Sequence, residues 1–284
     1  MTIQEIRSSL SPLYGESEAR AIARQLLEDA FSLSYTDVCL GALNSLSDEE
    51  TNRLTDMLQR LCEGEPVQYV TGKAFFFGRE FHVEPGVLIP RPETEVLIQQ
   101  ALEIMPSIKG SRSGKRYILD IGCGSGCIST TLAIELPNCE LSAWDISDTA
   151  LRVTRQNARH HGVNVDIYMQ DALSAPDGDT ALWDLIVSNP PYICNKEAES
   201  MHSNVLNHEP HIALFVPDTD PLLFYRSIAL YATHALRHGG ALIFEINEAY
   251  GKETLSLLSS LGYTDVTITK DQFDKDRIVS ARWR

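Results

Sequence analysis

Residues 117–126 read YILDIGCGSG, an apolar run that passes directly into a glycine-rich loop. The apolar run predicts a buried strand over Tyr117–Ile121, and a helix is expected after the loop. Glycines between a strand and a helix let the backbone come close to a ligand. The spacing of Gly122, Gly124 and Gly126 is GxGxG, not the GxGxxG that surrounds a pyrophosphate. The loop therefore favours an adenosine-containing ligand without phosphates, although a plain strand-to-helix turn has similar glycines.

Apolar runs and helical patterns alternate along the chain after this loop. Further strands are predicted at Glu140–Asp145, Val165–Met169, Leu182–Ser188, Ala241–Glu245, Asp265–Thr269 and Arg277–Arg284. This alternation is typical of an α/β fold, in which helices cover a parallel, doubly wound sheet. Ligands of such folds bind at the carboxyl ends of the strands.

Two acidic residues follow the next two predicted strands. Asp145 ends the strand after the glycine loop, where a carboxylate can accept hydrogen bonds from both hydroxyls of a ribose. Asp171, followed by Ala172, stands one strand further on, within reach of an adenine amino group. Together with the glycine loop, these positions predict the binding site of an adenosine derivative.

A second motif, Asn189-Pro190-Pro191-Tyr192, comes directly after the buried strand that ends at Ser188. The two prolines fix φ and remove two backbone donors, which leaves carbonyl groups as acceptors. An amide nitrogen is a poor nucleophile because its lone pair is delocalised. The side-chain oxygen of Asn189 and the carbonyl oxygen of Pro190 are expected to accept its two N–H groups and favour a tetrahedral nitrogen. Tyr192 is expected to cover the planar group by stacking, so the motif predicts methyl transfer from S-adenosylmethionine to such a nitrogen.

Residues 1–74 are predicted to form a small helical bundle. Apolar residues recur at helical spacing between Ala19 and Phe31, and Ser47 with Glu50 forms a capping-box pattern. Residues 75–90 alternate and contain turn residues, which predicts a β-hairpin linker to a catalytic domain at 91–284. Within that domain, Ser107–Lys115 (SIKGSRSGK) is typical of a flexible linker.

The composition narrows the classes of partner. The 284 residues contain 39 Asp and Glu against 24 Lys and Arg, a formal net charge of −15. A nucleic-acid-binding face needs basic residues, so this charge favours a protein or small-molecule substrate. Six cysteines without a CxxC or Cys/His cluster predict neither a disulfide framework nor a metal site. The N-terminus has no secretory signal pattern and no apolar run could span a membrane, so a cytoplasmic protein is expected.

The chain resembles the HemK family of class I, Rossmann-like methyltransferases over nearly its whole length. The glycine loop and Asn-Pro-Pro-Tyr are shared with methyltransferases that act on exocyclic amino or amide nitrogens. Two stretches narrow the resemblance to HemK, namely Pro66–Gly72 (PVQYVTG), continuing to Phe77-Gly78, and Val87–Glu95 (VLIPRPETE). Glu209-Pro210 and Asp276-Arg277 also match.

The resemblance implies that the chain methylates the glutamine of the Gly-Gly-Gln tripeptide in bacterial class I peptide chain release factors, with the N-terminal bundle helping to dock the release factor. The residues expected to bind S-adenosylmethionine are Gly122, Cys123, Gly124, Ser125, Gly126, Asp145, Asp171, Ala172 and Asn189. Asp171 is included because of its expected position near the adenine amino group. The residues expected to hold the glutamine are Asn189, Pro190, Pro191 and Tyr192, with Arg91, Pro92, Glu93 and Thr94 closing over the site. Asn189, Pro190 and Tyr192 are the expected catalytic residues. The sequence departs from the family at Asn247, where a glycine is typical, and at Tyr250, where a glutamine is frequent, which puts a role for that loop in doubt.

Three other interpretations remain. A DNA adenine or ribosomal RNA guanine methyltransferase has a similar Asn-Pro-Pro-Tyr loop but also a basic recognition segment, whereas Lys196 is the only Lys or Arg in residues 193–220. A nicotinamide-dependent dehydrogenase would need the GxGxxG spacing. A non-enzymatic scaffold that only docks on a translation factor would not need an intact Asn-Pro-Pro-Tyr motif.

Overall fold

The computed structural model describes residues 1–108 and 114–284, so residues 109–113 of the predicted linker lie outside the described residues. Contacts divide the chain into two compact units. The smaller unit comprises Met1–Ala74, Val83–Pro85 and Met201–Glu209. The larger unit comprises Phe75–His82, Gly86–Ser200 and Pro210–Arg284. Each unit is therefore assembled from separate pieces of the chain.

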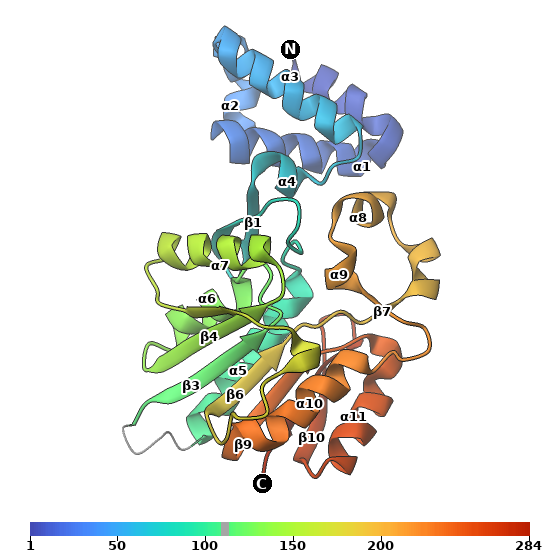
Figure 1. The fold of residues 1–284 in the computed structure, drawn as a ribbon. Helices are drawn as coiled ribbons and strands as arrows, with labels where there is room; N and C mark the ends of the chain where they lie inside the picture. The colour runs from blue at the N-terminus through green and yellow to red at the C-terminus, as the bar shows by residue number, and fades with distance from the viewer. Residues whose placement is uncertain (109–113) are drawn as a thin grey trace. The chain divides into compact units, whose positions relative to one another are not determined.

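A seven-stranded sheet forms the centre of the larger unit (Figure 1). The strands, in spatial order, are β10 (Thr264–Lys270), β11 (Asp276–Arg282), β9 (Leu236–Glu245), β6 (Trp183–Ser188), β3 (Arg116–Ile121), β4 (Cys139–Asp145) and β5 (Asp166–Met169). The five strands from β9 to β5 are parallel, and β11 runs antiparallel to both of its neighbours. The sheet confirms the predicted α/β fold.

Six of the seven predicted strands agree with the structure to within two residues at each end. The exception is β9, which begins at Leu236 and not at Ala241. Gly239 takes a φ of +82°, and the pairing of β6 with β9 shifts register between Trp183 and Leu185. A β-bulge therefore lets β9 continue through Gly239 and Gly240, where the sequence pattern predicts that no strand is present.

Helices cover both faces of the sheet (Figure 1). α5 (Glu95–Ile104), α6 (Cys127–Glu135) and α7 (Asp148–His160) lie on one face, and α10 (Leu223–Ala235) and α11 (Gly251–Ser260) lie on the other. Successive residues of a strand point to opposite faces. Ile118 accordingly belongs to the core under α5 and α6, whereas Leu119 belongs to the core under α10.

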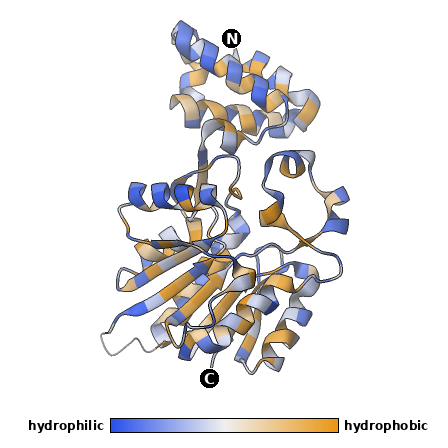
Figure 2. Cartoon of the chain, viewed as in Figure 1, coloured by the Kyte–Doolittle hydropathy of each residue, from blue (hydrophilic) through white to orange (hydrophobic). Residues whose placement is uncertain are grey.

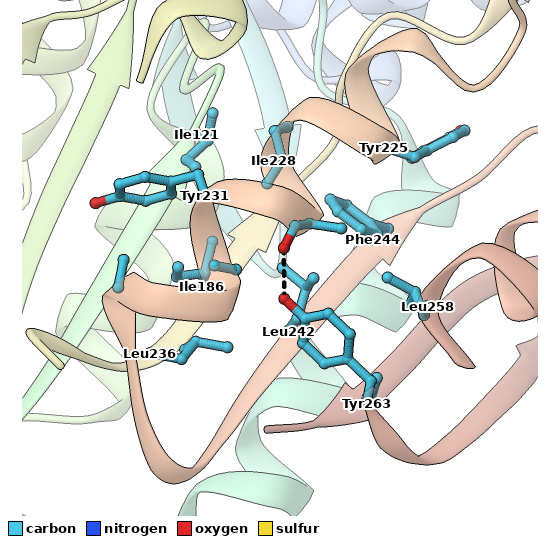
Figure 3. Packing of buried hydrophobic residues seen from close by; sticks show 14 of the residues in the cluster. Ile121, Ile186, Tyr225, Ile228, Tyr231, Leu236, Leu242, Phe244, Leu258 and Tyr263 are labelled. Carbon is cyan, nitrogen blue, oxygen red and sulfur yellow. Dashed lines mark hydrogen bonds between the residues drawn. The ribbon is translucent and has the colours of Figure 1, made fainter. Parts of the chain in front are cut away.

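Figure 3 shows the core beneath α10 and α11. Tyr225 and Ile228 of α10 pack with Phe244 of β9, and the Tyr263 hydroxyl donates a hydrogen bond of 2.7 Å to the carbonyl of Ala229. The buried strands are mostly hydrophobic in Figure 2, whereas α7 is mostly hydrophilic. The sheet is thus a rigid platform for the loops at its edge.

The smaller unit is a helical bundle, as expected. It contains α1 (Ile3–Phe31), α2 (Tyr35–Cys39), α3 (Asp48–Cys62), α4 (Val67–Thr71) and α8 (Ser203–His208), with a short 3-10 turn at Ala42–Ser45. The predicted capping box of Ser47 and Glu50 is present at the start of α3. α1 is interrupted at Gly15, whose φ of 73° and ψ of 167° are not helical.

A β-hairpin is formed by β1 (Lys73–Phe76) and β2 (Arg79–His82). Phe77 and Gly78 both take positive φ, which is the geometry of a two-residue hairpin turn. The hairpin occupies only the first half of the predicted 75–90 segment, and residues 83–90 contain no strand.

The shorter elements are 3-10 turns at Pro92–Thr94, Met105–Ser107, Ala172–Ser174, Asn195–Ser200 and Glu248–Tyr250, the helix α9 (His211–Leu214), and a two-stranded ladder of β7 (Ile193–Cys194) and β8 (Phe215–Val216). Within the described ranges, no helix combines the length and the apolarity needed to span a bilayer. Over the same residues, no group of three or more His, Cys, Asp and Glu side chains is arranged to hold a metal ion.

Candidate active site

A cavity of about 260 Å³ lies at the carboxyl ends of β3, β4, β5 and β6. Eight of the predicted site residues line it, namely Gly122, Gly124, Asp145, Asp171, Ala172, Asn189, Pro190 and Pro191. The structure thus brings the two sequence motifs into one cavity. Its volume lies just below the range that is usual for small-molecule sites, roughly 300–1,000 Å³.

The glycine loop forms the floor of the cavity. Gly122, Gly124 and Gly126 all take positive φ, a conformation that side chains with a Cβ rarely adopt. The N–H groups of Gly122 and Cys123 both donate to the carbonyl of Trp144, at 2.8 and 2.9 Å, which ties the loop to the end of β4. No side chain fills the space above Gly122 and Gly124, so a ligand can approach the backbone closely.

Asp145 connects the loop to the wall of the cavity. Its Oδ2 accepts a hydrogen bond of 2.9 Å from the N–H of Gly124, and its Oδ1 accepts one of 2.9 Å from the N–H of Ser147. Burial raises the pKa of this carboxyl above its usual value, although these hydrogen bonds lower it. Asp171 lines the same cavity, and its Oδ1 accepts from the N–H of Leu173 at 2.8 Å.

Three residues of the predicted cofactor set do not line the cavity. Cys123, Ser125 and Gly126 are buried behind the loop. The Ser125 carbonyl accepts from Asn157 at 2.8 Å, and the Thr154 hydroxyl contacts the Cys123 sulfur at 3.3 Å. These residues shape the loop from below and do not face the ligand space, because each is packed against α7.

Asp120, the last residue but one of β3, lies under the same loop and is fully buried. Its Oδ2 accepts a hydrogen bond of 3.0 Å from the N–H of Ser129, at the start of α6. Burial raises the pKa of this carboxyl to about 7. The sequence places Asp120 beside the loop but gives no sign of this shift.

The Asn-Pro-Pro-Tyr loop leaves the end of β6 and forms the opposite wall of the cavity. The hydroxyl of Ser188 donates to the carbonyl of Ile121 at 2.7 Å. This hydrogen bond joins the strand ends from which the Asn-Pro-Pro-Tyr loop and the glycine loop begin. Tyr192 was expected to stack on the planar substrate group. Its ring instead packs against the core beneath α10, and it does not line the cavity.

A buried carboxylate organises this loop from behind. Glu245, the last residue of β9, is 1% exposed. Its Oε2 accepts a hydrogen bond of 2.6 Å from the hydroxyl of Thr94, and its Oε1 accepts one of 3.1 Å from the hydroxyl of Tyr192. Burial raises the pKa of Glu245, whereas the two hydrogen bonds and the charge of Arg277 lower it.

This arrangement fixes the orientation of the Asn189 amide. An ionised carboxylate only accepts hydrogen bonds, so Thr94 donates to Glu245 and its hydroxyl oxygen is left as an acceptor. The Asn189 Nδ2 lies 3.4 Å from that oxygen and donates to it. The side-chain oxygen of Asn189 is therefore the atom left to accept from a substrate, as the chemistry of the motif requires.

The Arg91–Thr94 segment was expected to close over the site. None of its four residues lines the cavity. Thr94 is instead buried, and its hydroxyl oxygen lies 3.4 Å from the Asn189 Nδ2. Burial raises the pKa values of Tyr192 and Glu245; the charge of Arg91 offsets part of the first shift, and that of Glu93 adds to the second. The segment therefore contacts the Asn-Pro-Pro-Tyr loop through Thr94, and Pro92 starts the turn that leads into α5.

Asn247, one of the two departures from the family pattern, contacts the Asn-Pro-Pro-Tyr loop at its last residue. Its Nδ2 lies 3.2 Å from the carbonyl oxygen of Tyr192 and 3.2 Å from both carboxylate oxygens of Glu197. Tyr250, the other departure, has its hydroxyl 3.4 Å from the Cys194 sulfur. Both residues therefore contact the segment that follows Asn-Pro-Pro-Tyr. The sequence alone could not show this, because the partners are about 50 residues apart.

Comparisons with known proteins show which family the chain is similar to. Residues 2–72 match the family model described as PrmC N-terminal domain, and residues 97–211 match the model described as Methyltransferase small domain. Proteins named release factor glutamine methyltransferase are similar over most of the chain. The one from Bacteroides thetaiotaomicron is 42% identical and covers 97% of both chains. The one from Flavobacterium psychrophilum is 39% identical and covers 97% of this chain and 96% of the relative.

Solved structures share the fold at low sequence identity. A methyltransferase from Pyrococcus furiosus has a TM-score of 0.52 at 16% identity, covering 80% of this chain and 98% of its own. The N-terminal domain of human METTL16, solved in complex with SAH, has a TM-score of 0.51 at 16% identity, covering 73% and 76%. These two likenesses concern the fold alone, whereas the full-length relatives are decisive. The chain belongs to the family of release factor glutamine methyltransferases.

Proposed function

We propose that this chain transfers a methyl group from S-adenosylmethionine to the side-chain amide nitrogen, N5, of the glutamine in the Gly-Gly-Gln motif of bacterial class I peptide chain release factors. The observation that carries the proposal is the Asn189 amide, whose nitrogen is held by Thr94 and whose oxygen is left for a substrate. The net charge of −15 favours a protein as the macromolecular partner over a nucleic acid. A protein that modifies a translation factor acts in the cytoplasm.

The cavity has the chemistry that S-adenosylmethionine requires. The open space above Gly122 and Gly124 admits a ligand against bare backbone, and the Asp145 carboxylate suits ribose hydroxyls. Leu173, Phe224 and other apolar side chains line the same cavity and suit an adenine ring. When bound, S-adenosylmethionine supplies an electrophilic methyl group on its sulfonium centre.

The protein's own contribution is to hold and polarise the amide. The Asn189 side-chain oxygen and the Pro190 carbonyl accept hydrogen bonds from the two N–H groups, which favours a tetrahedral nitrogen with a localised lone pair. Pro190 and Pro191 have no N–H groups, so neither can donate a hydrogen bond to the lone pair of the substrate nitrogen, which stays available for the methyl group. Glu245 keeps both Thr94 and Tyr192 in place, so the acceptors need not reorganise during the reaction. No strong base is needed before attack, because the N–H becomes acidic once the nitrogen is methylated.

Mass spectrometry tests the proposal directly. The protein is incubated with S-adenosylmethionine and a purified bacterial release factor, and the tryptic peptide with Gly-Gly-Gln is fragmented. We expect one added methyl group on the glutamine side chain. Asn189→Ala is expected to lower kcat roughly 100-fold, the cost of one positioned acceptor. Asn195→Ala, an exposed residue just beyond the motif, is the matched control and should stay active.

An unmodified release factor would refute the assignment of the substrate. Binding of S-adenosylmethionine in the same preparation would then leave the Asn-Pro-Pro-Tyr chemistry standing, and nucleic-acid amines would be the next substrates to try. Retained turnover in Asn189→Ala would refute the role of the loop.

A further inference from the structure

The smaller unit contains a second cavity, of about 220 Å³, whose lining carries three arginines. Arg20 and Arg24 lie one turn apart in the second part of α1, and Arg7 comes from the part before the break at Gly15. The two parts of α1 line one cavity because Gly15 interrupts the helix. Apolar residues that include Ile3 and Leu27 complete the lining.

The arginines stand out against an acidic background. Residues 1–74 contain twelve Asp and Glu but only six Lys and Arg, and half of those six line this one cavity. Elsewhere in the segment, Arg60 forms two hydrogen bonds of 2.6 and 2.7 Å with the carboxylate of Glu65. A cluster of positive charge in this unit is therefore a local feature and not a consequence of composition.

The guanidinium groups of the cavity are mostly unpaired. Arg7 and Arg20 form no ion pair or hydrogen bond with any residue in the ranges 1–108 and 114–284. Arg24 has an exposed carboxylate, that of Glu28, at 3.6 Å, which is a weak surface pair. Three guanidinium groups that line one cavity repel one another. An anion bound in the cavity reduces this repulsion and forms charge-assisted hydrogen bonds with them.

We propose that this arginine cavity, lined by Arg7, Arg20 and Arg24, binds a carboxylate-bearing segment of the release factor. The inference rests on the proposed function, since it names the contact by which the N-terminal unit holds the protein substrate. A guanidinium group binds a carboxylate with two parallel hydrogen bonds. The apolar lining and Tyr35, which is 59% exposed at the cavity, suit an aliphatic or aromatic side chain next to the acidic one.

A carboxylate fits this cavity better than an RNA phosphate. A nucleic acid presents a line of phosphates and needs a continuous basic face. In residues 1–74, acidic residues outnumber basic ones two to one, so they would repel the rest of such a strand. A short acidic peptide segment can place one or two carboxylates in the cavity without that penalty.

Steady-state methylation of a full-length release factor tests the inference. We expect Arg20→Glu, and separately Arg7→Ala with Arg20→Ala, to raise the KM for the release factor about tenfold or more, with kcat within about twofold. The Kd for S-adenosylmethionine should not change, because these residues belong to the other unit. Arg53→Glu is the matched control, since it makes the same change of charge on the same unit at an arginine that lies over the ring of Phe31.

The outcomes separate the possibilities. An unchanged KM in the cavity variants, with normal thermal unfolding, would overturn the inference. An equal rise in KM for Arg53→Glu would also overturn it, because the effect would then belong to net charge. Loss of binding to an RNA oligonucleotide, with unchanged release factor kinetics, would assign the cavity to a nucleic acid instead. Absence of methylation by the wild-type protein would refute the proposed function, a result distinct from any of these.

Discussion

Replacing Gly126 by alanine tests whether the buried side of the glycine loop controls the cavity. Gly126 has a φ of +75°, and a Cβ at this position would lie 2.7 Å from the Cγ2 of Thr154, 2.9 Å from its Oγ1 and 3.0 Å from its Cα. The two side-chain atoms can rotate away, but the Cα belongs to the backbone of α7 and cannot. The loop and the helix must therefore move apart.

The loss of stability follows from two costs. A left-handed conformation costs a residue with a Cβ about 1–2 kcal/mol. Forcing a methyl group into a packed interface costs about 1–3 kcal/mol more. We therefore expect the free energy of unfolding to fall by about 2–5 kcal/mol. Binding should weaken as well, because the Thr154 hydroxyl that would be displaced donates a hydrogen bond of 3.1 Å to the carbonyl of Gly124.

Urea denaturation and calorimetric titration with S-adenosylmethionine measure the two effects. Gly162→Ala is the matched control, since Gly162 has a φ of +68° and no atom within 4 Å of the added Cβ. That variant should lose only the backbone cost of about 1–2 kcal/mol and keep its affinity. Adding Thr154→Ala to Gly126→Ala removes two of the three close contacts and should restore part of the stability. Equal losses in Gly126→Ala and Gly162→Ala would refute the argument from packing.

Three further predictions concern the network behind the catalytic loop and the carboxyl beneath the glycines. Glu245→Gln replaces one acceptor oxygen by a donor, so either Thr94 or Tyr192 loses its acceptor and the support of the Asn189 amide is weakened; we expect kcat to fall about tenfold. Burial raises the pKa of Glu245, so the wild-type kcat should decline on the acid side above the ordinary value of 4.5 as the carboxyl gains a proton; a decline that persists in Glu245→Gln would contradict this. Asn247→Gly removes the donor to the Tyr192 carbonyl, and steady-state assays should show a kcat reduced roughly fivefold; full activity would show that the contact does not matter. Burial raises the pKa of Asp120 from 3.8 to about 7, so the folded protein holds a proton that the unfolded chain releases, and stability should fall as pH rises through that range. Asp120→Asn should show a smaller slope in urea unfolding across the same range, and identical slopes would contradict the assignment.

Sequence reasoning was most successful where local patterns suffice. The central parallel strands are mostly apolar because both of their faces are buried, so their positions can be read from the chain, although the start of β9 was missed. The glycine loop and the Asn-Pro-Pro-Tyr loop were located because each directly follows such a strand. Strand ends of a parallel sheet converge, which is why eight predicted residues meet in one cavity.

The remainder depends on contacts between distant segments. Thr94 and Glu245 are 151 residues apart, and no local pattern indicates that they share a hydrogen bond. The family resemblance implied that residues 91–94 close over the site, whereas none of them lines the cavity and Thr94 contacts Asn189 and Glu245. The family resemblance implied that Cys123, Ser125 and Gly126 bind the cofactor, but all three are buried behind the loop and do not line the cavity. The arginine cavity escaped notice because its residues meet only through the break in α1 at Gly15.

The discontinuous make-up of the two units has a consequence for biosynthesis. The N-terminal unit includes Met201–Glu209, so a nascent chain of 74 residues has not yet produced all of it. The first helices can form early, but the bundle is completed only after the strands up to β7 have been synthesised. The same interleaving means that deleting residues 1–74 does not yield a clean catalytic fragment, because Val83–Pro85 and Met201–Glu209 would lose the neighbours they pack against. The interleaving therefore couples the folding of the two units.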